Sequence, residues 1–173
     1  CRVRVASRLG RGSAFGFSVP RSTPVSGVAG AVHAAPVGHG LKDKCVLVVD
    51  DESSVREGMH TLLGGWGCDV IVADSLSDAL ERIEARARRP DLIIADYRLR
   101  DGATGVEVIE KVQAEFGRDI PALLVTGDTG VDRLRAVRES GYQQMHKPVS
   151  PAKLREVLNA LLAAEARDPL SGN

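Results

Sequence analysis

Aromatic side chains are scarce in this sequence: phenylalanine, tryptophan and tyrosine make up only 3% of its 173 residues. Hydrophobic residues of all kinds nevertheless reach 43%, which is enough to build a core. That core must therefore be aliphatic, formed by valine, leucine, isoleucine and alanine. The length allows one ordinary domain with a tail or linker.

An excess of either charge is also lacking, because 23 lysines and arginines balance 23 aspartates and glutamates. No net field then favours nucleic acid or a membrane surface. No apolar run approaches the length needed to span a bilayer, and no signal peptide is recognisable. We therefore expect no nucleic-acid partner, no membrane contact and a cytoplasmic location.

The three cysteines, Cys1, Cys45 and Cys68, are odd in number and have no metal-ligand spacing. A reduced, cytosolic setting is the simplest interpretation. The sequence begins with cysteine rather than methionine, so we expect a fragment or a processed chain. It ends at Asn173, soon after the last predicted helix, which argues against a DNA-binding module and a role as a transcription factor.

The first twenty residues are basic and rich in glycine. Two alternating stretches, Arg2 to Ala6 and Ala14 to Val19, flank a turn at Gly10 to Ser13, and this pattern predicts a β-hairpin. Two strands alone are marginal in water, so we expect this hairpin to need a partner sheet. Residues 21–43 are rich in proline, glycine, alanine, serine and valine, which predicts a flexible linker.

From Lys44 onward, apolar runs alternate with helical patterns. The predicted strands are Cys45–Val49, Asp69–Ala73, Asp91–Ala95, Ala122–Thr126 and Gln143–His146. The predicted helices are Ser53–Leu63, Ser77–Ala87, Val106–Phe116, Val131–Ser140 and Pro151–Ala164. Strand–helix alternation repeated five times predicts an α/β fold, with a parallel sheet covered by helices on both faces.

Four of the predicted strands deliver polar side chains at or just after their carboxyl ends: Asp50 with Asp51, then Asp96, Thr126 and Lys147. In an open parallel sheet, this edge is where sites assemble. Each residue alone has an ordinary structural explanation, as a turn signal, a loop cap, a strand-end threonine or a solvated lysine. The set is more specific, because the order of its members and their placement on the first, third, fourth and fifth predicted strands match one constellation.

Adjacent carboxylates repel each other, and a divalent cation relieves that repulsion; Mg²⁺ suits such a site because it prefers oxygen ligands. Asp96 is then either a further metal ligand or a nucleophile, since aspartyl phosphates are a known covalent intermediate. The hydroxyl of Thr126 and the ammonium of Lys147 could contact phosphoryl oxygens. The sequence thus predicts a cation-assisted phosphoryl-acceptor site.

The sequence blocks VLVVDDE, DLIIADYRLRDGATGVEVI, PALLVTGD and HKPVSPAKL resemble the receiver domain of two-component response regulators. The resemblance covers about Lys44 to Ala164. It implies a flavodoxin-like, doubly wound sheet of five parallel strands in the order 2-1-3-4-5, with five helices.

This resemblance also implies residue roles. Asp96 would accept the phosphoryl group from the phosphohistidine of a histidine kinase or histidine phosphotransfer domain. Mg²⁺ would be bound by Asp51, Asp96 and the backbone carbonyl of Arg98, with Asp50 acting mainly through water. The residues that would contact the phosphoryl group are Thr126 and Lys147.

The sequence departs from the family pattern at two positions. Gln144 stands where an aromatic switch residue is common, and Arg100 stands where a proline is common, which predicts a more mobile loop after Asp96. In addition, Arg98 and Asp128 flank the expected phosphoryl position. If they pair across the site, they would hinder water and give a long-lived aspartyl phosphate.

The segment SRLGRGSAFGFSVP resembles the final hairpin of the ATP-binding domain of histidine kinases. An arbitrary glycine-rich hairpin or a nucleotide-binding loop in its own right are the alternatives. The resemblance implies a hybrid histidine kinase as parent protein, of which this chain is only the phosphoacceptor part. Residues 1–20 would then be the end of the kinase domain, 21–43 a linker, 44–165 the receiver and 166–173 a tail.

Three other functions compete with this interpretation. One is a stand-alone response regulator. Another is a Mg²⁺-dependent phosphatase with an aspartate nucleophile, but such enzymes commonly carry an acid two residues after the nucleophile, where this sequence has Arg98, which cannot act as an acid. The third is a degenerate receiver that only binds proteins, which the presence of all five site residues does not favour.

Overall fold

The computed structural model describes residues 2–8, 12–18, 39–127 and 140–165. The chain divides into two units, Cys1–Pro36 and Val37–Asn173. In the first unit, β1 (Arg2–Arg8) and β2 (Gly12–Ser18) pair antiparallel, with Arg8 opposite Gly12. The predicted hairpin is therefore confirmed as a two-stranded sheet.

The second unit is built on a five-stranded sheet in which every neighbouring pair is parallel. Its strands are β3 (Cys45–Val49), β4 (Asp69–Ala73), β5 (Leu92–Asp96), β6 (Ala122–Thr126) and β7 (Gln143–His146). The spatial order β4-β3-β5-β6-β7 is the predicted order 2-1-3-4-5. The third predicted strand is shifted by one residue, so that Asp96 is the last residue of β5 rather than the first residue beyond it.

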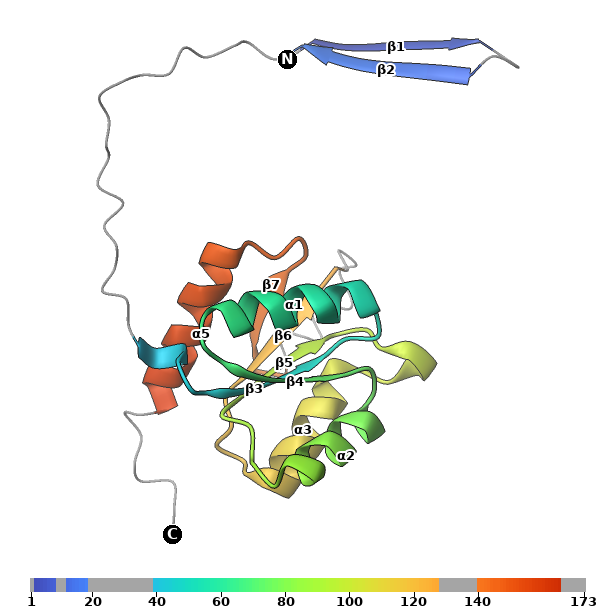
Figure 1. Ribbon diagram of the computed structural model, residues 1–173. Helices are drawn as coiled ribbons and strands as arrows, with labels where there is room; N and C mark the ends of the chain where they lie inside the picture. Colours follow the sequence, from blue (N-terminus) through green and yellow to red (C-terminus); the bar gives the residue numbers. More distant parts are fainter. Residues whose placement is uncertain (1, 9–11, 19–38, 128–139, 166–173) are drawn as a thin grey trace, which may run out of the picture. The chain divides into compact units, whose positions relative to one another are not determined.

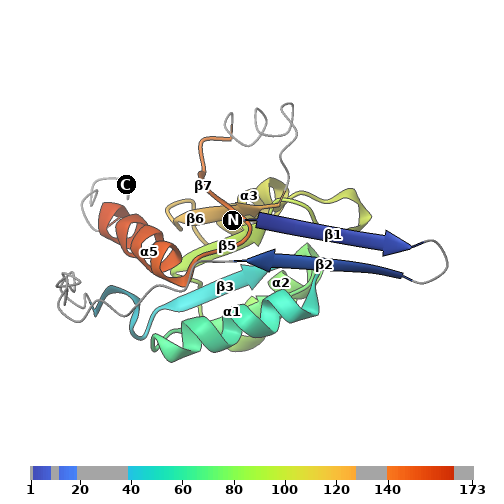
Figure 2. The same ribbon diagram turned by 90° about the horizontal axis from the view of Figure 1, so that it is seen from above.

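Helices cover both faces of this sheet, as Figure 1 shows. One face carries α1 (Ser53–Gly65) and α5 (Pro151–Glu165), and the other carries α2 (Leu76–Arg86) and α3 (Gly105–Phe116). Figure 2 views the unit from the side of α1 and α5. Residues 131–139 of the predicted helix Val131–Ser140 lie outside the described residues, so four of the five predicted helices are described. Within the part of the chain that is described, no helix has the length and apolarity to cross a membrane.

The starts of α2 and α3 are set by side-chain caps. The hydroxyl of Ser75 accepts from the backbone N–H of Asp78 at 3.3 Å, so α2 begins one residue before the predicted Ser77. Thr104 and Glu107 form a capping box, in which each side chain bonds to the other residue's backbone N–H, and α3 likewise begins one residue early. Both caps therefore fix where the chain turns away from the carboxyl edge of the sheet.

The core consists of two apolar layers, one on each face of the sheet. Leu47 and Val49 of β3 face the layer under α2 and α3, while Val46 and Val48 face the layer under α1 and α5. Because side chains alternate along a strand, this near-continuous apolar run serves both layers. The aliphatic core expected from the composition is thus what holds the sheet in place.

The second unit includes residues before β3. A short 3₁₀ helix (His39–Leu41) precedes the strand, and Leu41 is buried against the layer under α5. The backbone carbonyl of Leu41 accepts from the thiol of Cys68 at 3.3 Å and from the amide of Lys44 at 3.3 Å. The chain is therefore anchored to the fold a few residues before the first strand of the sheet.

Candidate functional site

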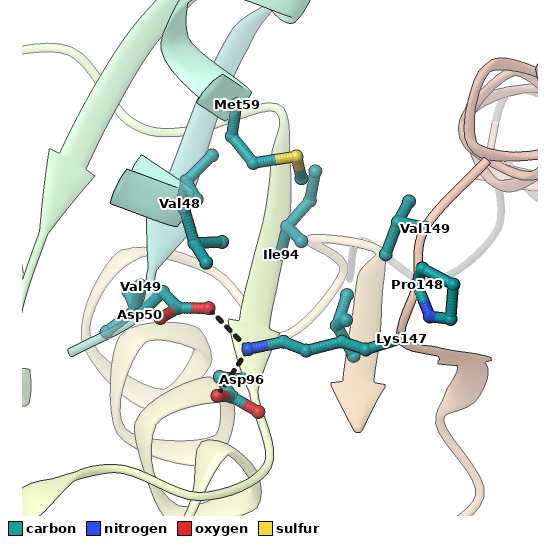
Figure 3. Close-up of a pocket in the computed structure, with 11 residues that line it drawn as sticks. Val48, Val49, Asp50, Met59, Ile94, Asp96, Lys147, Pro148 and Val149 are labelled. Atoms are coloured by element: carbon teal, nitrogen blue, oxygen red, sulfur yellow. Dashed lines mark hydrogen bonds and ion pairs between the residues drawn. The ribbon is translucent and has the colours of Figure 1, made fainter. Parts of the chain in front are cut away.

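The structure gathers the predicted site residues at the carboxyl edge of the sheet. Asp50 follows β3, Asp96 and Thr126 end β5 and β6, and Lys147 follows β7. The backbone N–H of Lys147 donates to the carbonyl of Thr126 at 2.8 Å, which aligns these two neighbouring strand ends. Figure 3 shows Asp50, Asp96 and Lys147 converging from three different strands.

Lys147 is the centre of this group. Its ammonium lies 2.9 Å from Oδ2 of Asp50 and 2.8 Å from Oδ2 of Asp96 (Figure 3). The Asp50 carboxylate is 5% exposed and that of Asp96 is 11% exposed, so both pairs are shielded from water. The other oxygen of Asp50 accepts from the backbone N–H of Glu52 at 2.9 Å. One partly buried ammonium, carried by the residue after β7, therefore bonds to acids at the ends of β3 and β5.

The three aspartates form a potential cation site. Ligand oxygens of Asp50, Asp51 and Asp96 all lie within 4.8 Å of one another. The backbone N–H of Arg98 lies 3.4 Å from Oδ1 of Asp96, which places the Arg98 peptide beside the cluster. A compact set of hard oxygen donors at a partly open edge is the environment that Mg²⁺ requires, because this ion keeps part of its water shell. The residues present thus fit a magnesium ion.

Charge and burial shift two pKa values at this site. Burial raises the pKa of Asp96 above its usual value, and the negative charge of Asp50 raises it further, although Lys147 opposes both. Burial alone would lower the pKa of Lys147, but hydrogen bonds and attraction from Asp96 and Asp50 outweigh it and raise that pKa. The two shifts thus have different causes: burial outweighs the attraction of Lys147 at Asp96, whereas the two neighbouring carboxylates outweigh burial at Lys147.

A mostly apolar cavity of about 210 Å³ adjoins the acid cluster on the α1 side of the sheet. The carboxylates of Asp50 and Asp96 and the side chain of Lys147 form its polar end (Figure 3). Its apolar lining comes from Val48, Val49, Val55, Met59, Ile94, Val125, Pro148 and Val149. The low dielectric of this wall strengthens the electrostatic interactions of the charges beside it.

Gly105 is a site-supporting residue that sequence analysis missed. A Cβ atom at this position would overlap the backbone carbonyl oxygen of Asp96 and would lie 3.0 Å from Cδ2 of Leu124. The Gly105 amide donates to the carbonyl of Tyr97 at 3.0 Å. The start of α3 is therefore seated directly on the end of β5. A glycine at the start of a helix that follows an acid-bearing loop was the available signal.

Two arginine contacts were missed as well. The Arg56 guanidinium donates to the backbone carbonyl of Asp50 at 2.6 Å. Arg100 donates through Nε to Oδ2 of Asp51 at 3.2 Å and through Nη2 to the backbone carbonyl of Asp51 at 3.0 Å. Arg100 was noted only for its departure from the family pattern. Nothing in the sequence indicated its partner, because the two residues are 49 positions apart.

Two further predictions concern Gln144 and Asp128. Gln144 lies on β7 opposite Leu124 and is half-buried, so the position of the usual aromatic switch is occupied by an amide. Asp128 lies outside the described residues. Its pairing with Arg98 stays a prediction, as does the mobility of the loop that carries Arg100.

The sequence and the fold both match known proteins. Residues 46–159 match the response regulator receiver domain family. The KDP operon transcriptional regulatory protein KdpE of Escherichia coli is 33% identical over 129 residues, which cover 72% of this chain and 56% of KdpE. The transcriptional regulatory protein ZraR of Klebsiella oxytoca is 32% identical over 119 residues, covering 68% of this chain and 26% of ZraR.

Among solved structures, the chemotaxis protein CheY4 of Vibrio cholerae is 27% identical with a TM-score of 0.60, over 69% of this chain and 98% of CheY4. The chain thus spans nearly all of a single-domain structure, but only 26% of ZraR and 56% of KdpE. The match lies in the unit that carries the acid cluster and the bridging lysine. The chain therefore belongs to the family of response regulator receiver domains, the phosphoryl-accepting modules of two-component signalling.

Proposed function

We propose that Asp96 is the phosphoryl acceptor and that its donor is a phosphohistidine on a histidine kinase or a histidine phosphotransfer domain. The observation that carries this proposal is the position of the Asp96 carboxylate. It ends the central strand β5, lies 2.8 Å from the Lys147 ammonium and shares a cluster with two further acids. A nucleophile placed at such an edge needs nearby positive charge, because the incoming group is itself anionic.

The transfer is a displacement at phosphorus. An oxygen of Asp96 forms a bond to phosphorus while the bond from phosphorus to the histidine nitrogen breaks, and that nitrogen keeps the electron pair. Mg²⁺ held by Asp50, Asp51, Asp96 and the Arg98 carbonyl would supply charge neutralisation between carboxylate and phosphoryl oxygens. In the acyl phosphate, the Lys147 ammonium and the Thr126 hydroxyl would contact the phosphoryl oxygens, since Thr126 ends the neighbouring strand β6 and the ammonium already lies 2.8 Å from Oδ2 of Asp96.

The experiment is intact mass after incubation with acetyl phosphate and Mg²⁺. We expect a single phosphoryl adduct in the native chain and none in Asp96→Ala or in the presence of a chelator. A Mg²⁺-dependent phosphatase would instead release inorganic phosphate continuously without a lasting stoichiometric adduct. Absence of an adduct in a chain shown separately to bind Mg²⁺ would overturn the assignment of Asp96 as an acceptor for small-molecule donors.

We also propose that the parent protein is a hybrid histidine kinase in the cytoplasm. Residues 1–20 would be the last hairpin of its ATP-binding domain, residues 21–43 the linker, 44–165 the receiver and 166–173 the tail. The antiparallel pairing of β1 and β2 supports this proposal, as does the division of the chain into two units. The coding sequence upstream of Cys1 tests it: nucleotide-binding boxes of a kinase are expected there, whereas a start codon would favour a stand-alone regulator.

A further inference from the structure

Arg100 holds Asp51 at two points. The guanidinium Nε donates to Oδ2 of the Asp51 carboxylate at 3.2 Å, and Nη2 donates to the Asp51 backbone carbonyl at 3.0 Å. The Arg100 side chain is 74% exposed, whereas that of Asp51 is 30% exposed. A side chain at the rim of the site therefore lies against one of the three clustered acids.

The loop that carries Arg100 is held in shape by its own contacts. Leu99 is buried, and its amide donates to the carbonyl of Ala103 at 3.1 Å. Arg98 and Thr104 form an antiparallel bridge on either side of this turn. Between them, residues Arg100–Gly102 form a short 3₁₀ turn. The loop thus presents Arg100 from an anchored base, and only its side chain has to move to leave Asp51.

Two basic side chains form ion pairs with all three acids of the cluster. Lys147 is paired with Asp50 and Asp96, and Arg100 is paired with Asp51. These pairs have different surroundings, because Lys147 is largely shielded whereas Arg100 is largely exposed. A divalent cation that enters the cluster needs an oxygen of Asp51, and the guanidinium already uses Oδ2.

We propose that Arg100 competes with the divalent cation for Asp51 and thereby sets the affinity of the receiver for Mg²⁺. This inference rests on the proposed function, because it concerns the same acid cluster. Arg100 acts as a positioning residue: its guanidinium bonds to Asp51, and its effect is exerted through that residue. Metal binding then includes a step in which the guanidinium leaves the carboxylate and turns into solvent.

The expected effect is modest and depends on salt. Ion pairs at exposed positions contribute little, so removing the competing guanidinium should tighten Mg²⁺ binding by about two- to fivefold. Removal of a positive charge a few ångströms from the cation acts in the same direction. Because the charges of Arg100 and Asp51 are accessible to solvent, the difference in Mg²⁺ affinity between the native chain and the variant without the guanidinium should shrink as ionic strength rises from about 0.01 M to about 0.5 M.

Isothermal titration of the whole chain with MgCl₂ tests this inference without any phosphorylation. The variants are Arg100→Gln, Arg100→Lys and Arg118→Gln; Arg118 is an exposed residue between α3 and β6 and serves as a matched charge control. We expect Arg100→Gln to lower the Kd two- to fivefold at low salt, and Arg118→Gln to leave it within error of the native value. Arg100→Lys keeps the charge but loses the two-point contact, so its Kd should lie between the two.

The outcomes separate this inference from the proposed function. If Arg100→Gln binds Mg²⁺ no more tightly than the native chain, or no more tightly than Arg118→Gln does, competition at Asp51 is refuted while Asp96 remains a valid acceptor. If neither the native chain nor Arg100→Gln binds Mg²⁺, and neither gains an adduct from acetyl phosphate, the proposed function itself fails. A second readout is the adduct formation rate, which should be faster in Arg100→Gln at subsaturating Mg²⁺ and equal at saturation.

Discussion

Gly105→Ala should disturb both the stability of the receiver and the position of the Asp96 carboxylate, its proposed phosphoryl acceptor. The added Cβ would overlap the carbonyl oxygen of Asp96 and would lie 3.0 Å from both the Asp96 carbonyl carbon and Cδ2 of Leu124. Ordinary contacts begin near 3.4 Å, so the two carbon atoms would have to retreat by about 0.4 Å, and the oxygen by more, in a close-packed interior. Two of the three obstacles are backbone atoms of β5, which is hydrogen-bonded on both sides.

Over-packing of this kind costs about 1–3 kcal/mol of unfolding free energy. Gly58→Ala is the matched control, because it is the same substitution at an exposed position inside α1, where nothing lies within 4 Å of the new methyl group. Alanine is the better helix former there, so Gly58→Ala should stabilise the protein by about 0.5–1 kcal/mol. The two variants should therefore differ by about 1.5–4 kcal/mol, with opposite signs relative to the native chain.

Urea denaturation followed by the fluorescence of Trp66, the single tryptophan of the chain, measures this difference in the unit that contains both glycines. Under native conditions, Gly105→Ala should also slow adduct formation from acetyl phosphate, because the clash falls on the peptide that positions Asp96. The reasoning is refuted if Gly105→Ala is as stable as the native chain or gains stability as Gly58→Ala does.

Three further predictions concern charge and capping. Lys147→Met leaves two shielded carboxylates without their cation and should destabilise the receiver by about 1–3 kcal/mol, a loss that Mg²⁺ partly reverses in thermal unfolding. Burial would raise the pKa of Asp91, but hydrogen bonds from the Cys45 amide and attraction from nearby basic side chains outweigh burial and lower that pKa. The stability that the Asp91 carboxylate contributes is therefore present above its unfolded-state pKa and is lost below about pH 4. Asp91→Asn should flatten the acid limb of a curve of unfolding free energy against pH, and an unchanged limb would contradict this. Thr104→Ala breaks the capping box with Glu107 and should cost about 1 kcal/mol, which a urea midpoint indistinguishable from the native one would disprove.

The features that sequence analysis predicted correctly are those with a strong local signal. Strand–helix alternation repeated five times specifies a parallel sheet, and near-continuous apolar strands such as Cys45–Val49 fit strands that are buried on both faces. Ser-Pro at 150–151 marks the start of α5 at the predicted residue. The convergence of Asp50, Asp96, Thr126 and Lys147 follows from strand order alone, since all of them sit at one edge of the sheet.

The features that were missed depend on contacts between distant segments. The pairing of Arg100 with Asp51 joins residues 49 positions apart through a flexible side chain, and no period or spacing encodes it. The close approach of Gly105 to Asp96 depends on how α3 packs on the end of β5. The one-residue errors in the starts of α2 and α3 arose because the caps, Ser75 and Thr104, were not identified as such.

The two basic side chains at the site, Lys147 and Arg100, compensate different carboxylates of the acid cluster. Three clustered carboxylates would oppose folding, and a metal-free receiver therefore needs positive charge among them. Lys147 is shielded and bonded to two acids, so removing it is costly, as expected for a buried pair that loses one partner. Arg100 is exposed and bonded to one acid, so displacing it costs little. Under the proposed function and the proposed competition at Asp51, the receiver keeps Lys147 in place for the phosphoryl group and still admits a divalent cation, because the side chain that leaves, Arg100, is the exposed one.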